Sequence, residues 1–421
     1  MGKIFHQAKS RFKPNKFSVP LMGIDEDFLD AFGRFRVSNT ATLFESSFAY
    51  DEQPLIFESR TLNGGTVTHD SVSRSLMLNV DVAAGSFASI QSRSYIPYEK
   101  GKSQIIKMTG VIGPPIPGVR SRIGYFDADD GIYWQQTGDG MSIVRRSSVT
   151  GSVINAVVAQ SDWNIDKLDG TGPSKIKLDP SKSQILIIDG QWLGVGRVRV
   201  GFNINGINYY AHEFLHANVV DFAPYMRTFT LPVRYEVEAI SAGSLGSMQV
   251  VCCDVESEGG VDSPVGYVFS AKNDVDVPTS DTPTAVLSIR PALEYPEASG
   301  HANRTFIIPG DISVLVGSAP CVVTVMYDAV LSGGTWTRAN GSSAVEYGVG
   351  QTISEPGIAV NSLFVPSGSG NVRSASGEKI SSQYPLTLDI EGANPKSITL
   401  VAQAISGTGT VRAATSWREV R

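Results

Sequence analysis

The chain has 421 residues, a length typical of two or three domains, and a net charge of −6, which excludes a strongly basic binder of polyanions. Hydrophobic residues make up 42% and charged residues 18%, a globular balance that excludes an intrinsically disordered chain. The 42 glycines favour many strands joined by tight turns. The three cysteines argue against a disulfide scaffold, and no apolar run is long enough for a membrane helix. We therefore expect neither a membrane partner nor specific nucleic-acid recognition.

The first segment, residues 1–29, reads as an extended arm. Its first twenty residues contain no acid, and the aromatic side chains between the cations follow neither helical nor strand spacing. Such a segment either frays or docks on an acidic partner surface, with cations guiding and phenylalanines anchoring it. Contact with nucleic acid is less favoured, since five charges give only weak, salt-sensitive binding. The proposed docking residues are Lys3, Phe5, Lys9, Arg11, Phe12, Lys13, Lys16 and Phe17.

Residues 50–240 alternate apolar and polar side chains in the period of half-buried strands. The clearest examples are 76–82 and 198–204, and Asn205-Gly206 supplies the turn that a two-residue hairpin requires. We expect a lectin-like β-sandwich over 50–240, preceded by a basic arm and short connecting segment over 1–49.

A polar stretch rich in glycine and serine at 241–261 predicts a linker between domains. Beyond it, residues 262–421 predict a second domain of short strands, a jelly roll or β-sandwich. Strands are expected at 285–289, 312–316, 322–327, 398–404 and 410–415. The expected fold is therefore all-β, with two β-sandwich or jelly-roll domains preceded by an extended N-terminal arm.

The segment His212-Glu213-Phe214-Leu215-His216 matches the H-E-x-x-H pattern of zinc hydrolases. That chemistry needs a helix, because two histidines one turn apart share the metal. Here the segment continues a predicted return strand, on which His212 and His216 would lie about 13 Å apart. We therefore predict strand and loop histidines, with a zinc hydrolase only as a remote alternative.

Asp162, Asn164 and Asp166 have the oxygen-ligand spacing of a calcium loop, but Lys167 and Pro173 stand where such a loop needs glycine and glutamate. An Asx-turn loop over a packed Trp163 is the favoured interpretation, with these three residues as the alternative metal ligands. No metal site and no cofactor is expected otherwise, since the phosphate-binding glycine patterns fail.

Two further groups of residues bear on carbohydrate chemistry. Asp127, Asp129 and Asp130 precede Gly131, and a carboxylate pair can hydrolyse glycosides, but aspartates before glycine usually form turns. Aromatic side chains beside polar loops can stack on sugars, although in a sandwich they more often belong to the core. The possible glycan contacts are Tyr133, Trp134 and Trp163, and Trp192 is a further candidate. We predict no catalytic residues and no enzymatic activity.

Several stretches resemble a widespread group of tailed-bacteriophage virion structural proteins. They are DAFGRFRVSNTATLFES (30–46), RSSVTGS (146–152), QSDWNIDKLDGTG (160–172), QWLGVGRVRVGF (191–202), LPVRYEV (231–237) and SWREV (416–420). The resemblance runs from residue 30 to 421 and leaves the basic arm outside. It supplies no catalytic residues.

The resemblance implies a non-enzymatic component of a phage particle, attached to tail, baseplate or capsid and assembled in the bacterial cytoplasm. The expected partners are further copies of this chain, as a homo-oligomer, and other virion proteins on which the arm docks. A tail protein that binds host surface glycans is the alternative.

Overall fold

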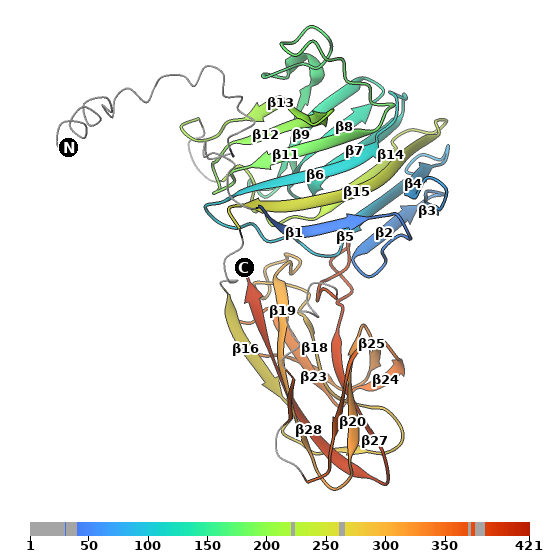
Figure 1. The fold of residues 1–421 in the computed structure, drawn as a ribbon, viewed down its shortest axis with the longest axis vertical. Helices are drawn as coiled ribbons and strands as arrows, with labels where there is room; N and C mark the ends of the chain where they lie inside the picture. The colour runs from blue at the N-terminus through green and yellow to red at the C-terminus, as the bar shows by residue number, and fades with distance from the viewer. Residues whose placement is uncertain (1–29, 31–39, 220–223, 261–265, 369–371, 375–383) are drawn as a thin grey trace, which may run out of the picture.

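The computed structural model describes residue 30 and residues 40–219, 224–260, 266–368, 372–374 and 384–421. The predicted arm over 1–29 and its docking residues lie outside them. Two β-sandwiches follow one another along the chain, and the end of the chain lies close to the boundary between them (Figure 1). The expectation of an all-β fold with two sandwich domains is confirmed. The described residues contain no helix long and apolar enough to cross a membrane.

One sheet of the first sandwich has eight strands in the order β13-β12-β11-β6-β15-β4-β3, with β1 also paired to β15. The long central strand β15 pairs with β6 along one side, and with β4 and then β1 along the other. The strands are β1 (Thr40–Ser47), β3 (Thr66–Asp70), β4 (Ser75–Val80), β6 (Ser103–Val111), β11 (Gln184–Gly190), β12 (Val198–Ile204), β13 (Ile207–Phe214) and β15 (Gly246–Glu258).

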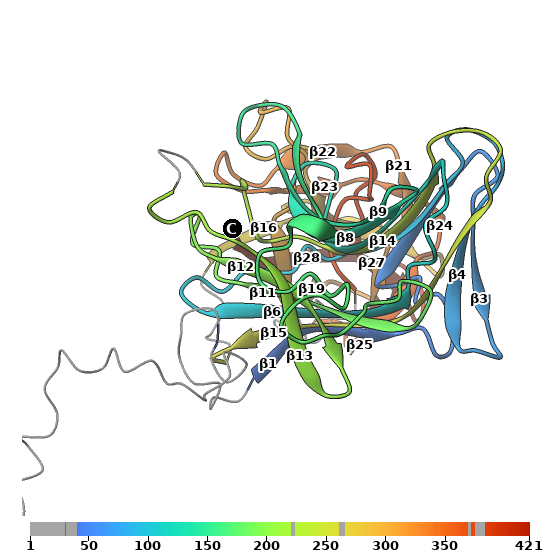
Figure 2. The same cartoon turned by 90° about the horizontal axis from the view of Figure 1, so that it is seen from above.

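The facing sheet has seven strands in the order β10-β9-β8-β7-β14-β5-β2. Figure 2 shows the two sheets as separate layers, with β6 and β15 in one and β8 and β14 in the other. The strands are β2 (Phe57–Leu62), β5 (Phe87–Ser92), β7 (Val119–Phe126), β8 (Gly131–Thr137), β9 (Gly140–Ser147), β10 (Ile154–Ala159) and β14 (Val233–Ala239), and a single 3-10 turn, Gln160–Asp162, follows β10.

Alternation in the sequence places one face of each strand in the core between these sheets. Leu76 and Leu78 on β4 and Phe202 on β12 are buried there, and the ring of Trp134 packs edge-on against Phe202 at 4.9 Å. The predicted hairpin joins β12 to β13 through Asn205 and Gly206, whose φ angles of 55° and 86° are those of a type I′ turn. The sequence prediction of this hairpin is confirmed.

The second sandwich packs a five-stranded sheet, β16-β28-β19-β26 with β17 on β28, against a six-stranded sheet, β22-β23-β18-β27-β20-β25. A separate pair, β21 and β24, lies beside them. The strands are β16 (Tyr267–Lys272), β17 (Val277–Thr279), β18 (Thr284–Pro291), β19 (Phe306–Val316), β20 (Cys321–Tyr327), β21 (Val330–Ser332), β22 (Thr335–Arg338), β23 (Val345–Val349), β24 (Thr352–Glu355), β25 (Ile358–Val365), β26 (Val372–Ser374), β27 (Ile398–Ala404) and β28 (Gly409–Val420).

The predicted boundaries of the first domain were wrong at both ends. The linker expected over 241–261 contains β15, because Met248 and Val250 alternate with polar residues and point into the first core. The connecting segment expected within 1–49 contains β1, which pairs with β15. The first sandwich therefore extends from Thr40 to Glu258, and the chain passes to the second between Glu258 and Tyr267.

Candidate functional site

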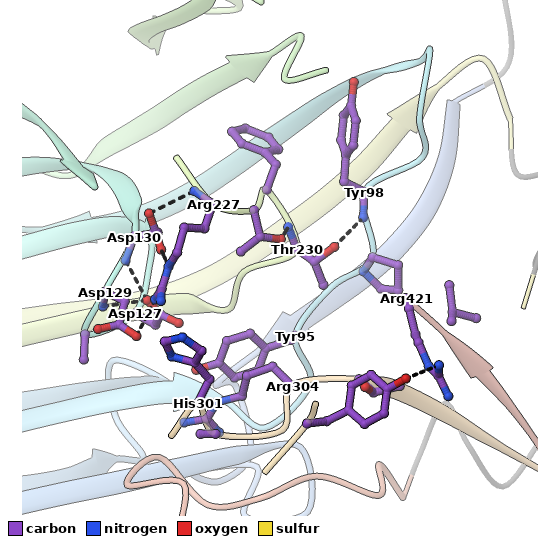
Figure 3. A pocket seen from close by; sticks show the side chains of 18 of the residues that line it. Tyr95, Tyr98, Asp127, Asp129, Asp130, Arg227, Thr230, His301, Arg304 and Arg421 are labelled. Atoms are coloured by element: carbon purple, nitrogen blue, oxygen red, sulfur yellow. Dashed lines mark hydrogen bonds and ion pairs between the residues drawn. The ribbon is translucent and has the colours of Figure 1, made fainter. Parts of the chain in front are cut away.

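A cavity of about 620 Å³ lies where the two sandwiches meet, and segments from both line it (Figure 3). The first sandwich contributes residues after β5, the turn between β7 and β8, Trp192 after β11, and residues before β14. The second contributes the segment between β18 and β19, Ile390, and the end of β28. The site is therefore assembled from loops that only the folded, two-domain chain brings together.

The turn between β7 and β8 forms one wall. The Asp127 carboxylate accepts hydrogen bonds from the backbone amides of Asp129 and Asp130, both at 2.8 Å. Gly131 closes the turn with a φ of 146°, where a Cβ atom would lie 2.1 Å from Cβ of Phe126. Burial raises the pKa of Asp127, although the two amides act in the opposite direction. The sequence prediction that these aspartates form a turn is confirmed.

Arg227 neutralises the rest of this acidic turn. Its Nη2 donates to Asp129 at 2.6 Å and its Nε to Asp130 at 3.0 Å. Asp130 is buried and also accepts from the hydroxyl of Ser148 at 2.9 Å. Both oxygens of Asp130 thus accept hydrogen bonds within the protein. Asp129, whose side chain is 51% exposed, is the carboxylate of this turn that faces solvent.

Arg304 and Tyr95 form the contact between the domains at the middle of the cavity. The guanidinium carbon of Arg304 lies 4.6 Å from the centroid of the Tyr95 ring. The same guanidinium donates to the carbonyl oxygens of Asp389 at 2.9 Å and Ile390 at 3.3 Å. Burial raises the pKa of Tyr95, and Asp127 raises it further, so the hydroxyl stays protonated at neutral pH.

The end of the cavity opposite the aspartates is basic (Figure 3). The guanidinium of Arg421 lies 4.3 Å from the Tyr295 ring centroid and also donates to the hydroxyl of Tyr295 and the carboxylate of Glu419. Lys100 reaches across from the first sandwich and donates to the main-chain oxygen of Arg421 at 3.4 Å. Lys100 itself is exposed.

Aromatic rings line the wall of the first sandwich. Tyr98 meets Trp192 and Phe229 edge-on, with centroids 5.8 Å and 5.6 Å apart. Tyr98 and Phe229 are buried, whereas Trp192 is only half-buried, so part of its ring borders the cavity. The pocket thus combines acidic, basic and aromatic groups, the set that can hold a polar ligand with apolar faces.

The three aromatic residues named as possible glycan contacts do not reach this pocket or any other surface. Tyr133, Trp134 and Trp163 are 1%, 0% and 3% exposed, so the glycan alternative is wrong for them and the favoured interpretation, that such residues belong to the core, is confirmed. Tyr133 and Trp134 point to opposite faces of β8, and both faces are covered: Trp134 lies in the core, while Tyr133 packs against Phe126 at 4.6 Å. The ring nitrogen of Trp163 donates to the carbonyl of Val158.

The calcium-like spacing belongs to a loop whose polar atoms bind the backbone. Asn164 exchanges hydrogen bonds with the amide and carbonyl of Glu213, at 2.9 Å and 3.0 Å. Asp166 accepts from the amides of Leu168 and Ser174, at 2.9 Å and 2.8 Å. The Asx-turn interpretation is confirmed. Across the part of the chain that the structure describes, no group of three His, Cys, Asp or Glu is placed to hold a metal.

The zinc-hydrolase alternative fails on local structure, because His212 lies on strand β13 and not on a helix. His212 accepts from the amide of Asn164 at 3.3 Å. His216 lies beyond the strand, stacks on Tyr225 at 3.7 Å between centroids, and contacts Arg145 through Nε2 at 2.6 Å. The two histidines therefore serve separate structural contacts.

Sequence reasoning identified the aspartate turn and Trp192 but missed Tyr95, Lys100, Arg304 and Arg421. Nothing local distinguishes these four residues, since each becomes part of the site only through contacts across the domain boundary. Lys100 and Arg421, for instance, are 321 positions apart.

No family model matches the chain. No curated protein matches it either. Solved structures with similarity include a legume lectin-like domain from Entamoeba histolytica, with 11% identity and a TM-score of 0.30, covering 52% of this chain and 98% of that one. A glycosyl hydrolase family protein from Mycobacterium fortuitum has 11% identity and a TM-score of 0.36, covering 51% and 99%. Peanut lectin has 12% identity and a TM-score of 0.30, covering 52% and 98%. Similarity at this level carries no information about activity or ligands.

Proposed function

We propose that this chain is a non-enzymatic structural component of a bacteriophage virion that assembles as a homo-oligomer through its β-domains and attaches by its N-terminal arm. Support comes first from the six sequence stretches that resemble tailed-phage structural proteins. Additional support comes from the histidine and calcium-like segments, whose polar groups are engaged in holding the fold.

The observation that carries the proposal is the apolar character of the outermost strands. At the edge of the seven-stranded sheet, β10 exposes Ile154 and Val157 by 54% and 57%. At the edge of the six-stranded sheet, β25 exposes Phe364 by 75%. Among the described strands, β10 pairs only with β9 and β25 only with β20. An edge strand with exposed apolar side chains is a template for association, which another copy of the chain would use.

The proposal is tested by quantitative mass spectrometry of purified particles, with the major capsid protein as the internal standard. A fixed copy number is expected: hundreds of copies would mean the capsid surface, and a few dozen or fewer the tail or a vertex. Absence from particles would overturn the assignment.

Light scattering of the isolated protein tests the homo-oligomer. The substitution Phe364→Lys places a charge on the apolar edge strand β25, so it should lower the measured mass of the assembly. The matched control Val72→Lys, at a 92% exposed turn position, should not.

A further inference from the structure

We propose that the cavity between the two sandwiches binds an acidic saccharide, a sugar chain that carries a carboxylate. This goes beyond the structural role proposed above. With a volume of about 620 Å³, the cavity falls within the range of about 300–1,000 Å³ typical of small-molecule sites.

The acidic end offers a hydrogen-bond acceptor to sugar hydroxyls. Asp129 binds Arg227 through Oδ2, and its Oδ1 has no partner among the described residues. The neighbouring carboxylates do not compete for the ligand, because Asp130 is saturated and Asp127 is buried against backbone amides. A carboxylate fixed in this way accepts hydrogen bonds from neutral donors such as hydroxyl groups.

The aromatic wall offers a surface for the apolar faces of sugar rings. Trp192 is held edge-on by Tyr98, which is itself fixed by a hydrogen bond from its hydroxyl to the carbonyl of Lys102 at 3.1 Å. The exposed part of the Trp192 ring therefore borders the cavity in a fixed orientation. Rigid aromatic rings provide contact area at little cost in conformational entropy.

The preference for an acidic sugar follows from the charges at the basic end. Of the five Lys and Arg residues that line the cavity, three have a carboxylate partner: Arg227 with Asp129 and Asp130, Arg234 with Glu236, and Arg421 with Glu419. The other two are Lys100 and Arg304.

Lys100 and Arg304 have no Asp or Glu side-chain partner in the described part of the chain: Lys100 donates to the main-chain oxygen of Arg421, and Arg304 donates to the carbonyl oxygens of Asp389 and Ile390. Asp127 and Asp389 act on Arg304 at longer range without forming an ion pair with it. Arg304, which has no ion-pair partner within the described ranges and is partly buried between the domains, attracts an anionic group, and Lys100 adds a second, exposed cation to the cavity wall. Asp129 at one end and Lys100 at the other then match a ligand with hydroxyl groups and one carboxylate.

The experiment is titration calorimetry of the full chain with two matched probe pairs: sialyllactose against its methyl ester, and trigalacturonate against its trimethyl ester. We expect at least one acidic probe to bind and its neutral partner to bind tenfold more weakly or not at all. Lys100→Gln and Asp129→Asn should each weaken that binding tenfold or more. The controls Lys182→Gln and Asp139→Asn change exposed residues away from the cavity and should leave affinity unchanged.

Equal affinity for the acidic and neutral probes would overturn the carboxylate assignment. Binding that is insensitive to Lys100→Gln and Asp129→Asn would overturn the site, and the absence of binding by all four probes would overturn the whole proposal. Thermal melting of each variant confirms that it is folded. Particle incorporation is measured separately, so failure here is distinguishable from failure of the virion assignment.

Discussion

Arg304 of the second sandwich stacks on Tyr95 of the first, with 4.6 Å between the guanidinium carbon and the ring centroid. Two further contacts lie in the same seam: the amide of Ile390 donates to the carboxylate of Glu58 at 3.2 Å, and Arg60 forms an ion pair with Glu391. These polar contacts between described residues join the two domains, so removing one of them should change how the domains are coupled.

Arg304→Gln should weaken this coupling. The variant loses the cation–π contact, worth about 0.5–2 kcal/mol, and changes the hydrogen bonds to the carbonyls of Asp389 and Ile390. Differential scanning calorimetry should show broader or separated transitions where the wild-type chain shows more concerted unfolding. Lys272→Gln, which removes an exposed ion pair with Asp274, is the control. Identical calorimetric profiles for both variants would contradict a coupling role for Arg304.

Asp189→Asn should strongly destabilise the first sandwich. Arg199 and Asp189 form an ion pair at 2.5 Å with side chains 1% and 0% exposed, and Tyr210 donates to the same carboxylate at 2.9 Å. Removing one partner of a buried pair leaves an uncompensated charge, which costs about 3–5 kcal/mol. Chemical denaturation measures this loss.

The matched control for that experiment is Asp276→Asn. Its ion pair with Arg412 is about half exposed on both sides, and such pairs contribute roughly 0–1 kcal/mol. If Asp189→Asn lowers the free energy of unfolding no more than Asp276→Asn does, the buried pair is not a determinant of stability.

The sequence predicted strands well where alternation was regular. Residues 198–204 coincide with β12 and 398–404 with β27. It failed at 241–261, because the glycines and serines before β15 outweighed the alternation of Met248 and Val250 within it. Composition averaged over a window cannot separate a polar turn from the strand that follows it.

The candidate site was only partly predictable for a different reason. The aspartate turn is held by hydrogen bonds between residues two and three positions apart, so its sequence is sufficient to identify it. Adjacent strand residues such as Tyr133 and Trp134 point to opposite faces, and only the tertiary structure shows that both faces are covered. Arg304 has no local signature at all, since its partner Tyr95 lies in the other sandwich.

Deleting residues 2–20 should leave a folded protein that fails to join particles. The described sandwiches begin at Thr40, so their cores do not require the deleted segment. Two full-length variants separate the contributions: glutamine at the five cations tests guidance by charge, and serine at the three phenylalanines tests anchoring. Incorporation is measured by mass spectrometry of particles assembled in infected cells. Normal incorporation of the truncated chain would refute docking through the arm.

The stability of the first sandwich should fall as the pH decreases from about 6.5 to 4. Burial lowers the pKa of His216 to about 4; the hydrogen bond to the carbonyl of Gly196 opposes this shift, and Arg145 adds to it. In the unfolded chain His216 takes up a proton near pH 6.5. Between these two pKa values only the unfolded state gains the proton. The free energy of unfolding therefore decreases as the pH is lowered, by at most about 1.4 kcal/mol per pH unit for one group.

His216→Phe tests this dependence, because it preserves an aromatic ring against Tyr225 but cannot titrate. Its unfolding free energy, measured by denaturant titration at several pH values, should be lower at neutral pH, since the contacts with Arg145 and Gly196 are lost. It should also vary less between pH 6.5 and 4. Some slope should persist, because burial also lowers the pKa of His212. The exposed His301→Gln control should keep the wild-type slope, and an unchanged slope in His216→Phe would assign the pH dependence to other groups.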